Sequence, residues 1–92
     1  MAWKVRYHKK AIKFLEKLDE GKRSILLSKI QELVNSLESG VLPIQRMDIK
    51  RLKGVWDGFL RLRVGEVRII FKINVEDETI LIYSIHFREK VY

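Results

Sequence analysis

The stretch Arg61-Leu62-Arg63-Val64-Gly65-Glu66-Val67-Arg68 decides the fold, because apolar and polar residues alternate on both sides of Gly65-Glu66. This pattern predicts two strands that are joined by a two-residue hairpin turn. Closing the turn places Arg63 directly opposite Arg68, with Arg61 diagonal to both. Like charges that face each other across two strands destabilise a sheet. We therefore expect an anion on this face, and phosphate fits best because guanidinium groups bind its oxygens in pairs.

The opposite face of the same hairpin is apolar. Its expected cross-strand pairs are Val64 with Val67, Leu62 with Ile69, and Leu60 with Phe71. These side chains must face a core, since a register slip of one residue would turn all of them toward solvent.

Length and charge limit the class of protein. The 92 residues suffice for one domain, residues 1–92, and a hydrophobic fraction of 47% indicates a globular chain rather than a disordered one. The net charge of +7 is large for this length and predicts an anionic partner. Charge alone leaves nucleic acid, an acidic protein and an anionic membrane surface open.

Cofactor and membrane signals are weak. The chain has no cysteine, and its two histidines, His8 and His86, are far apart in sequence, which argues against a zinc site. We expect no cofactor. The sequence lacks an apolar run of about 18–20 residues and a secretory signal, so we expect a cytoplasmic protein that does not enter a membrane.

Periodicity changes along the chain. Residues 3–7 alternate as a strand, and apolar residues then recur at helical spacing from Lys9. Asp19 can cap a second helix, which ends before Gly40. Further strands are expected at residues 48–54, 59–64, 67–75 and 79–87. The prediction is an α+β domain of two layers: an N-terminal strand, an antiparallel helix hairpin on one face of the sheet, and a mostly antiparallel β-meander.

The register of the last strand depends on the preceding loop. A loop of about five residues after Ile73 predicts that Leu81, Tyr83, Ile85 and Phe87 face the core, and that Ile80, Ile82, Ser84, His86 and Arg88 share the arginine side. Changing the loop by one residue would flip the whole strand. The expected register leaves Ile70, Ile80 and Ile82 on the open side, where an acidic amphipathic partner, a dimer contact or Val91-Tyr92 could cover them.

Four segments, taken in order, resemble the RelE/ParE toxin superfamily of prokaryotic toxin–antitoxin systems. They are Leu52-Lys53-Gly54, Leu60-Arg61-Leu62-Arg63-Val64-Gly65, Val67-Arg68-Ile69-Ile70-Phe71 and Arg88-Glu89-Lys90-Val91-Tyr92. The resemblance covers nearly the whole chain and implies the toxin of a type II system, which binds a cognate antitoxin. RelE-like members are metal-independent endoribonucleases that cut messenger RNA on the ribosome, by attack of a ribose 2′-hydroxyl on the adjacent phosphate.

The resemblance also implies roles for five residues. Arg61 and Arg63 match two basic residues on the strand before the hairpin turn, and Arg68 matches an arginine that holds the phosphate. Arg88 matches an arginine near the leaving oxygen. Tyr92 matches a tyrosine that stacks on a base or assists proton transfer.

Some residues depart from the family pattern. Arg61 stays protonated and is a poor general base, and Val67 replaces a common tyrosine. His86 suits acid–base chemistry by residue type, although a polar residue at a strand edge explains it equally well. Two other functions stay open: a ParE-like protein that inhibits DNA gyrase without catalysis, and a basic RNA-binding domain that does not cut.

Overall fold

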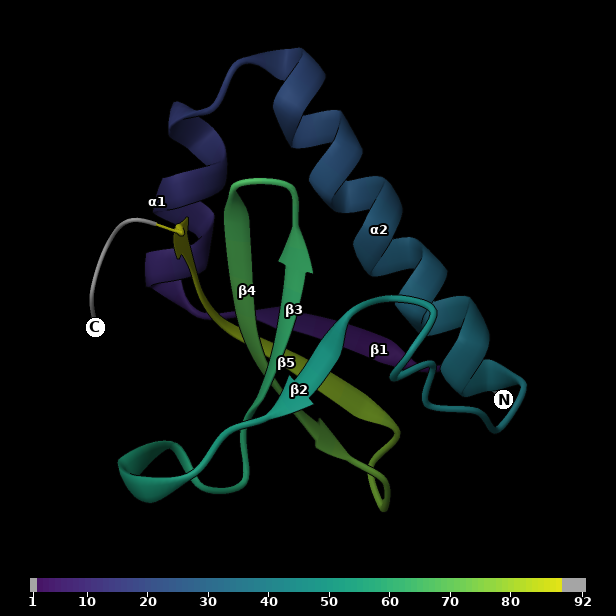
Figure 1. Cartoon of the computed structure of the whole chain (residues 1–92). Coiled ribbons are helices and arrows are strands. Elements are labelled where there is room, and N and C mark those ends of the chain that lie inside the picture. Colours follow the sequence, from purple (N-terminus) through teal and green to yellow (C-terminus); the bar gives the residue numbers. More distant parts are fainter. Residues whose placement is uncertain (1, 89–92) are drawn as a thin grey trace.

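The computed structural model describes residues 2–88, in which one mixed sheet packs against two α-helices (Figure 1). In chain order the elements are β1 (Lys4–Tyr7), α1 (Lys9–Lys17), α2 (Glu20–Glu38), β2 (Ile49–Arg51), the 3-10 turn η1 (Gly54–Trp56), β3 (Leu60–Val64), β4 (Val67–Asn74) and β5 (Thr79–Phe87). The sheet order is β1-β5-β4-β3-β2, and only the β1–β5 pair among these is parallel. The predicted fold class is confirmed.

The helix hairpin is fixed by local hydrogen bonds. As expected, Asp19 caps α2, because its side chain accepts a hydrogen bond of 2.9 Å from the backbone N–H of Lys22. Arg23 Nη1 donates to the backbone carbonyls of Leu15 and Leu18, at 3.1 and 3.2 Å. These bonds satisfy the C-terminal end of α1 and hold the start of α2 against it.

The β3–β4 hairpin has the predicted register. Its pairs are Leu60 with Phe71, Arg61 with Ile70, Leu62 with Ile69, Arg63 with Arg68, and Val64 with Val67. Gly65 occupies the turn with a φ of +59°, which a residue without a side chain adopts at little cost. The apolar face of the hairpin joins residues of both helices in the buried core, including Ala11, Leu33 and Phe71.

The first half of the last strand differs from the prediction. Ile73 pairs with Ile80, so the loop is one residue longer than assumed, and Ile80 and Ile82 are fully buried in the core. Leu81 and Tyr83 do not join this buried set. The expected exposure of Ile80 and Ile82 on the arginine side is therefore wrong.

The second half of the same strand has the predicted orientation. A register shift lets Ile70 pair with Ser84 while Phe71 pairs with Ile82, so Tyr83 is an extra residue in a β-bulge. Beyond it, Ile85 faces the core and His86 pairs with Arg68. The longer loop turns the first half of β5 over by one residue, and the extra residue of the bulge restores the predicted orientation in the second half.

Residues 2–88 contain no helix that is long and apolar enough to cross a membrane. They also contain no cluster of three or more histidine, cysteine, aspartate or glutamate residues that could hold a metal ion.

The core depends most on its largest fully buried side chain, Phe71. We predict that Phe71→Ala lowers the free energy of unfolding by about 3–5 kcal/mol, because it removes buried apolar surface and leaves a cavity. Chemical denaturation followed by circular dichroism measures this loss. Val55→Ala is the matched control, since Val55 is 96% exposed, and it should change stability by less than about 0.5 kcal/mol.

Candidate phosphate-binding site

The sheet face opposite the helices carries a row of polar side chains from three neighbouring strands. Arg63 of β3 lies opposite Arg68 of β4, and Arg68 lies opposite His86 of β5. Adjacent strands are about 4.8 Å apart, so the row spans roughly 10 Å. We call the sheet side that bears this row the arginine face. Two of the predicted site residues, Arg63 and Arg68, lie in this row, and Arg61 lies on the same face two residues before Arg63 on β3.

An aspartate that the sequence analysis did not select binds two of these arginines. Asp48 Oδ1 accepts a hydrogen bond from Arg61 Nη2, and Asp48 Oδ2 accepts one from Arg63 Nε, both at 3.0 Å. The Asp48 carbonyl also accepts a hydrogen bond of 3.2 Å from the backbone N–H of Arg63. Asp48 therefore fixes both the backbone and the side chains at this edge of the site.

The position of Asp48 follows from the short strand β2. Ile49 pairs with Leu62, which brings the preceding residue beside Arg63. Asp48 has a φ of +53°, a left-handed conformation that aspartate tolerates better than most residues. The sequence contains Asp48 directly before a predicted strand, but its contact with Arg61 and Arg63 can be inferred only when the register of β2 against β3 is known.

Burial divides the arginines into two groups. Arg61 is only 8% exposed and forms an ion pair with Asp48. The side chain of Arg63 is 35% exposed, and Arg68 is half-buried. One carboxylate that contacts two guanidinium groups can neutralise only one of their charges. The surface of the site therefore stays positive where Arg63 lies.

The last two predicted site residues lie near the chain terminus. Arg88 is exposed just after β5, and its backbone N–H donates a hydrogen bond of 2.6 Å to the carbonyl of Glu66 in the hairpin turn. This bond brings Arg88 to the end of the sheet that carries Arg63 and Arg68. Tyr92 lies outside the described residues. His86 is half-buried, with Nδ1 3.3 Å from the carbonyl oxygen of Phe87.

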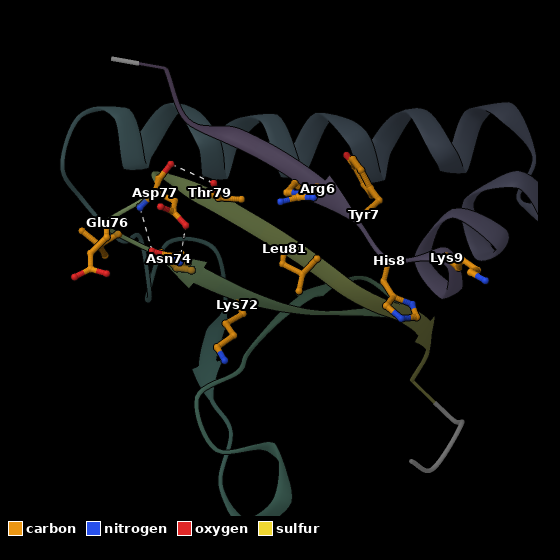
Figure 2. A pocket seen from close by; sticks show the side chains of 12 residues that line it. Arg6, Tyr7, His8, Lys9, Lys72, Asn74, Glu76, Asp77, Thr79 and Leu81 are labelled. Carbon is orange, nitrogen blue, oxygen red and sulfur yellow. Dashed lines mark hydrogen bonds between the residues drawn. The ribbon is translucent and has the colours of Figure 1, made fainter.

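A separate hollow of about 830 Å³ opens toward the other end of the arginine face (Figure 2). Arg6 of β1 and Lys72 of β4 both pair with Leu81 of β5, and all three line the hollow together with His8. Asp77 lies at its far end and is engaged by Asn74, whose Nδ2 donates to Asp77 Oδ2 at 3.1 Å.

Solved structures with this architecture include RelE toxins in complex with RelB antitoxins. The archaeal RelE–RelB complex of Pyrococcus horikoshii matches with a TM-score of 0.71 and 27% identity, over 99% of this chain and 100% of that chain. The RelB–RelE complex of Methanococcus jannaschii matches with a TM-score of 0.70 and 27% identity, over 92% of each chain. The strand order and helix layer thus define a RelE-like toxin fold.

Sequence comparison gives the same family. The profile described as "ParE toxin of type II toxin-antitoxin system, parDE" matches residues 5–92. A relative from Methanocaldococcus jannaschii that carries the toxin name RelE1 is 35% identical over 92 residues, which cover all of this chain and 97% of the relative. The chain belongs to the RelE/ParE superfamily and is a toxin of a type II toxin–antitoxin system. The resemblance found in the sequence is confirmed.

The ion pairs of Asp48 should contribute measurably to stability. We predict that Asp48→Asn lowers the free energy of unfolding by about 1–3 kcal/mol, because the buried Arg61 guanidinium loses its counter-charge. Chemical denaturation at low ionic strength measures this effect.

The matched control is Glu32→Gln, which breaks the exposed pairs of Glu32 with Lys29 and Arg46. Exposed pairs contribute about 0–1 kcal/mol, so this variant should be nearly as stable as the wild type. Equal losses in the two variants would contradict the supporting role of Asp48.

Proposed function

We propose that this toxin is a ribosome-dependent endoribonuclease that cuts messenger RNA, and that the arginine face holds the scissile phosphate. The observation that carries the proposal is the pair of Arg63 and Arg68, which face each other across the β3–β4 hairpin. The hairpin register imposes this repulsive pair, and a bound phosphate would turn the repulsion into two attractive contacts.

The chemistry fits transition-state stabilisation. When the ribose 2′-hydroxyl attacks the phosphorus, a fifth oxygen bonds to it and negative charge grows on the non-bridging oxygens before the 5′-oxygen leaves. Arg63 and Arg68 would bind this charge more tightly in the transition state than in the substrate. Because guanidinium groups supply the positive charge, the step as proposed requires no metal ion.

The remaining residues would support this step. Arg61, held by Asp48, keeps the neighbouring Arg63 in place and does not act as a base. Arg88 would neutralise the leaving oxygen, and Tyr92 would stack on a base or assist proton transfer. His86 is the residue of the row whose type suits acid–base chemistry, and the ribosome would orient the 2′-hydroxyl for attack.

The proposed partners are the ribosome, messenger RNA and a cognate antitoxin. The archaeal RelE relatives from Pyrococcus horikoshii and Methanococcus jannaschii are bound to RelB, which supports an antitoxin partner for this chain as well. An antitoxin with an acidic amphipathic segment would cover the arginine face and block access to phosphate.

A second candidate is inhibition of DNA gyrase. The family profile that matches residues 5–92 carries the description of a ParE toxin, which supports a ParE-like function. A basic RNA-binding domain without cleavage is a third candidate. All three use a positive surface, and only the first needs Arg68 for a chemical step.

The test is primer extension on a translating messenger RNA, with purified antitoxin-free protein, with and without ribosomes. We expect cleavage in the decoding site that requires ribosomes, and a rate about 10²–10³ lower for Arg68→Ala, because one charge-stabilising donor is lost. Arg46→Ala is the control, since it removes the same charge from an exposed ion pair with Glu32 on another part of the surface.

Equal rates for the two variants would contradict the role of Arg68. If the wild type does not cut, a gyrase supercoiling assay follows. Inhibition in that assay would assign the protein to the ParE-like candidate, and no effect would leave RNA binding alone.

A further inference from the structure

Three aromatic side chains form a cluster that the proposed phosphate contact does not use. Trp56, Phe59 and Tyr83 contact one another, with ring centroids 5.4 Å apart for Trp56–Phe59, 5.6 Å for Trp56–Tyr83 and 5.4 Å for Phe59–Tyr83. Two come from the segment between β2 and β3, and the third comes from the β5 bulge. We call these three residues the aromatic cluster.

The aromatic cluster lies on the arginine face. Phe59 directly precedes β3, and the ammonium group of Lys72, which lines the hollow, sits over its ring. Ile70 belongs to this side too, since it pairs with Arg61, yet it is 1% exposed and lies outside the core cluster beneath the helices. The arginine face therefore has a small apolar layer of its own.

Two lysines lie over rings of the aromatic cluster. Lys72 Nζ lies 5.3 Å from the ring centroid of Phe59, and Lys10 Nζ lies 5.6 Å from that of Tyr83. Both lysines are exposed, and the three rings are half-buried. An ammonium group over an aromatic ring is held weakly at an exposed site, by about 0.5–1 kcal/mol, and a ligand can displace it.

The surroundings of the cluster are basic. The hollow beside it is lined by Arg6, His8 and Lys9 as well as Lys72, and Figure 2 shows Arg6, Leu81 and Lys72 coming from three different strands around it. Two acidic residues, Glu76 and Asp77, also line the hollow, and Asp77 already binds Asn74 through side chain and backbone. Positive charge beside partly exposed rings is the combination with which proteins bind single-stranded nucleic acid.

We propose that the aromatic cluster is a base-stacking site for single-stranded RNA, with Lys10 and Lys72 as its phosphate contacts. A base would stack on a ring and displace the ammonium group that lies over it, and that ammonium group would then bind the adjacent phosphate. This inference rests on the proposed function, since the same RNA strand would continue to the arginine row. Arg68 and Lys72 are four residues apart on β4, about 13 Å at ~3.3 Å per residue, which a strand of a few nucleotides can span.

The fluorescence emission of Trp56 reports on base stacking at the aromatic cluster. The chain has two tryptophans, Trp3 and Trp56, so Trp3→Phe leaves Trp56 as the only indole emitter. This protein is titrated with a short 2′-O-methyl oligoribonucleotide, which cannot be cleaved, and with an abasic strand of the same length. We expect the base-containing strand to quench Trp56 emission, and the abasic strand to bind without quenching, as followed by anisotropy of an end label.

Two variants separate stacking from charge. Phe59→Leu keeps an apolar side chain, and we expect it to weaken binding of the base-containing strand at least about fivefold while binding of the abasic strand is unchanged. Lys72→Ala leaves all three rings in place and should weaken binding of both strands. Circular dichroism confirms that each variant is folded.

Other outcomes overturn the inference. Equal quenching by both strands, or no quenching by either, would remove base stacking from this surface. Quenching by polyglutamate alone would assign the surface to an acidic protein. Failure of the proposed function appears separately, because a wild-type protein that binds and quenches but does not cut messenger RNA would keep the stacking site and lose the cleavage.

Discussion

Arg63 and Arg68 face each other across the β3–β4 hairpin because the apolar residues of the same two strands must face the helices. The alternation that buries one side of the hairpin fixes the charge on the other. Asp48 relieves part of the repulsion by accepting hydrogen bonds from Arg61 and Arg63 at 3.0 Å. The buried Arg61 gains its counter-charge in this way, and Arg63, whose side chain is 35% exposed, keeps positive charge at the surface. The positions of Asp48 and His86 on the arginine face follow from the pairing of Arg63 with Arg68.

The arginine face has two ends with different chemistry. The row of Arg63, Arg68 and His86 gathers charge near the hairpin turn, and the aromatic cluster lies toward the hollow lined by Arg6 and Lys72. The β-bulge in β5 determines the positions of residues at both ends. It lets Ile80 and Ile82 complete the core while His86 still meets Arg68, and its extra residue, Tyr83, joins the aromatic cluster. A toxin that binds the phosphates of an RNA strand at one end and its bases at the other would use both ends of the arginine face.

The parts of the fold that depend on local sequence could be predicted, and the parts that depend on distant pairing could not. A two-residue turn fixed the hairpin register, and Asp19 marked the start of α2. The register of β5 depends on a loop length and a bulge, neither of which has a strong sequence signal. Asp48 was missed because its partners are 13 and 15 residues away and β2 is only three residues long. The family resemblance identified the toxin class, but Tyr92 lies beyond the described residues and its role stays a prediction.

The most direct test of the central claim is the salt dependence of RNA binding. Binding of a non-cleavable single-stranded oligoribonucleotide is measured from low to moderate salt for the wild type, Arg68→Gln and Arg46→Gln. Each phosphate contact contributes about 0.7 to the slope of log K against log salt for single strands. We expect Arg68→Gln to reduce the slope by about that amount, and Arg46→Gln to leave it unchanged. Identical slopes for the wild type and Arg68→Gln would show that the arginine row does not bind phosphate, which would contradict the account.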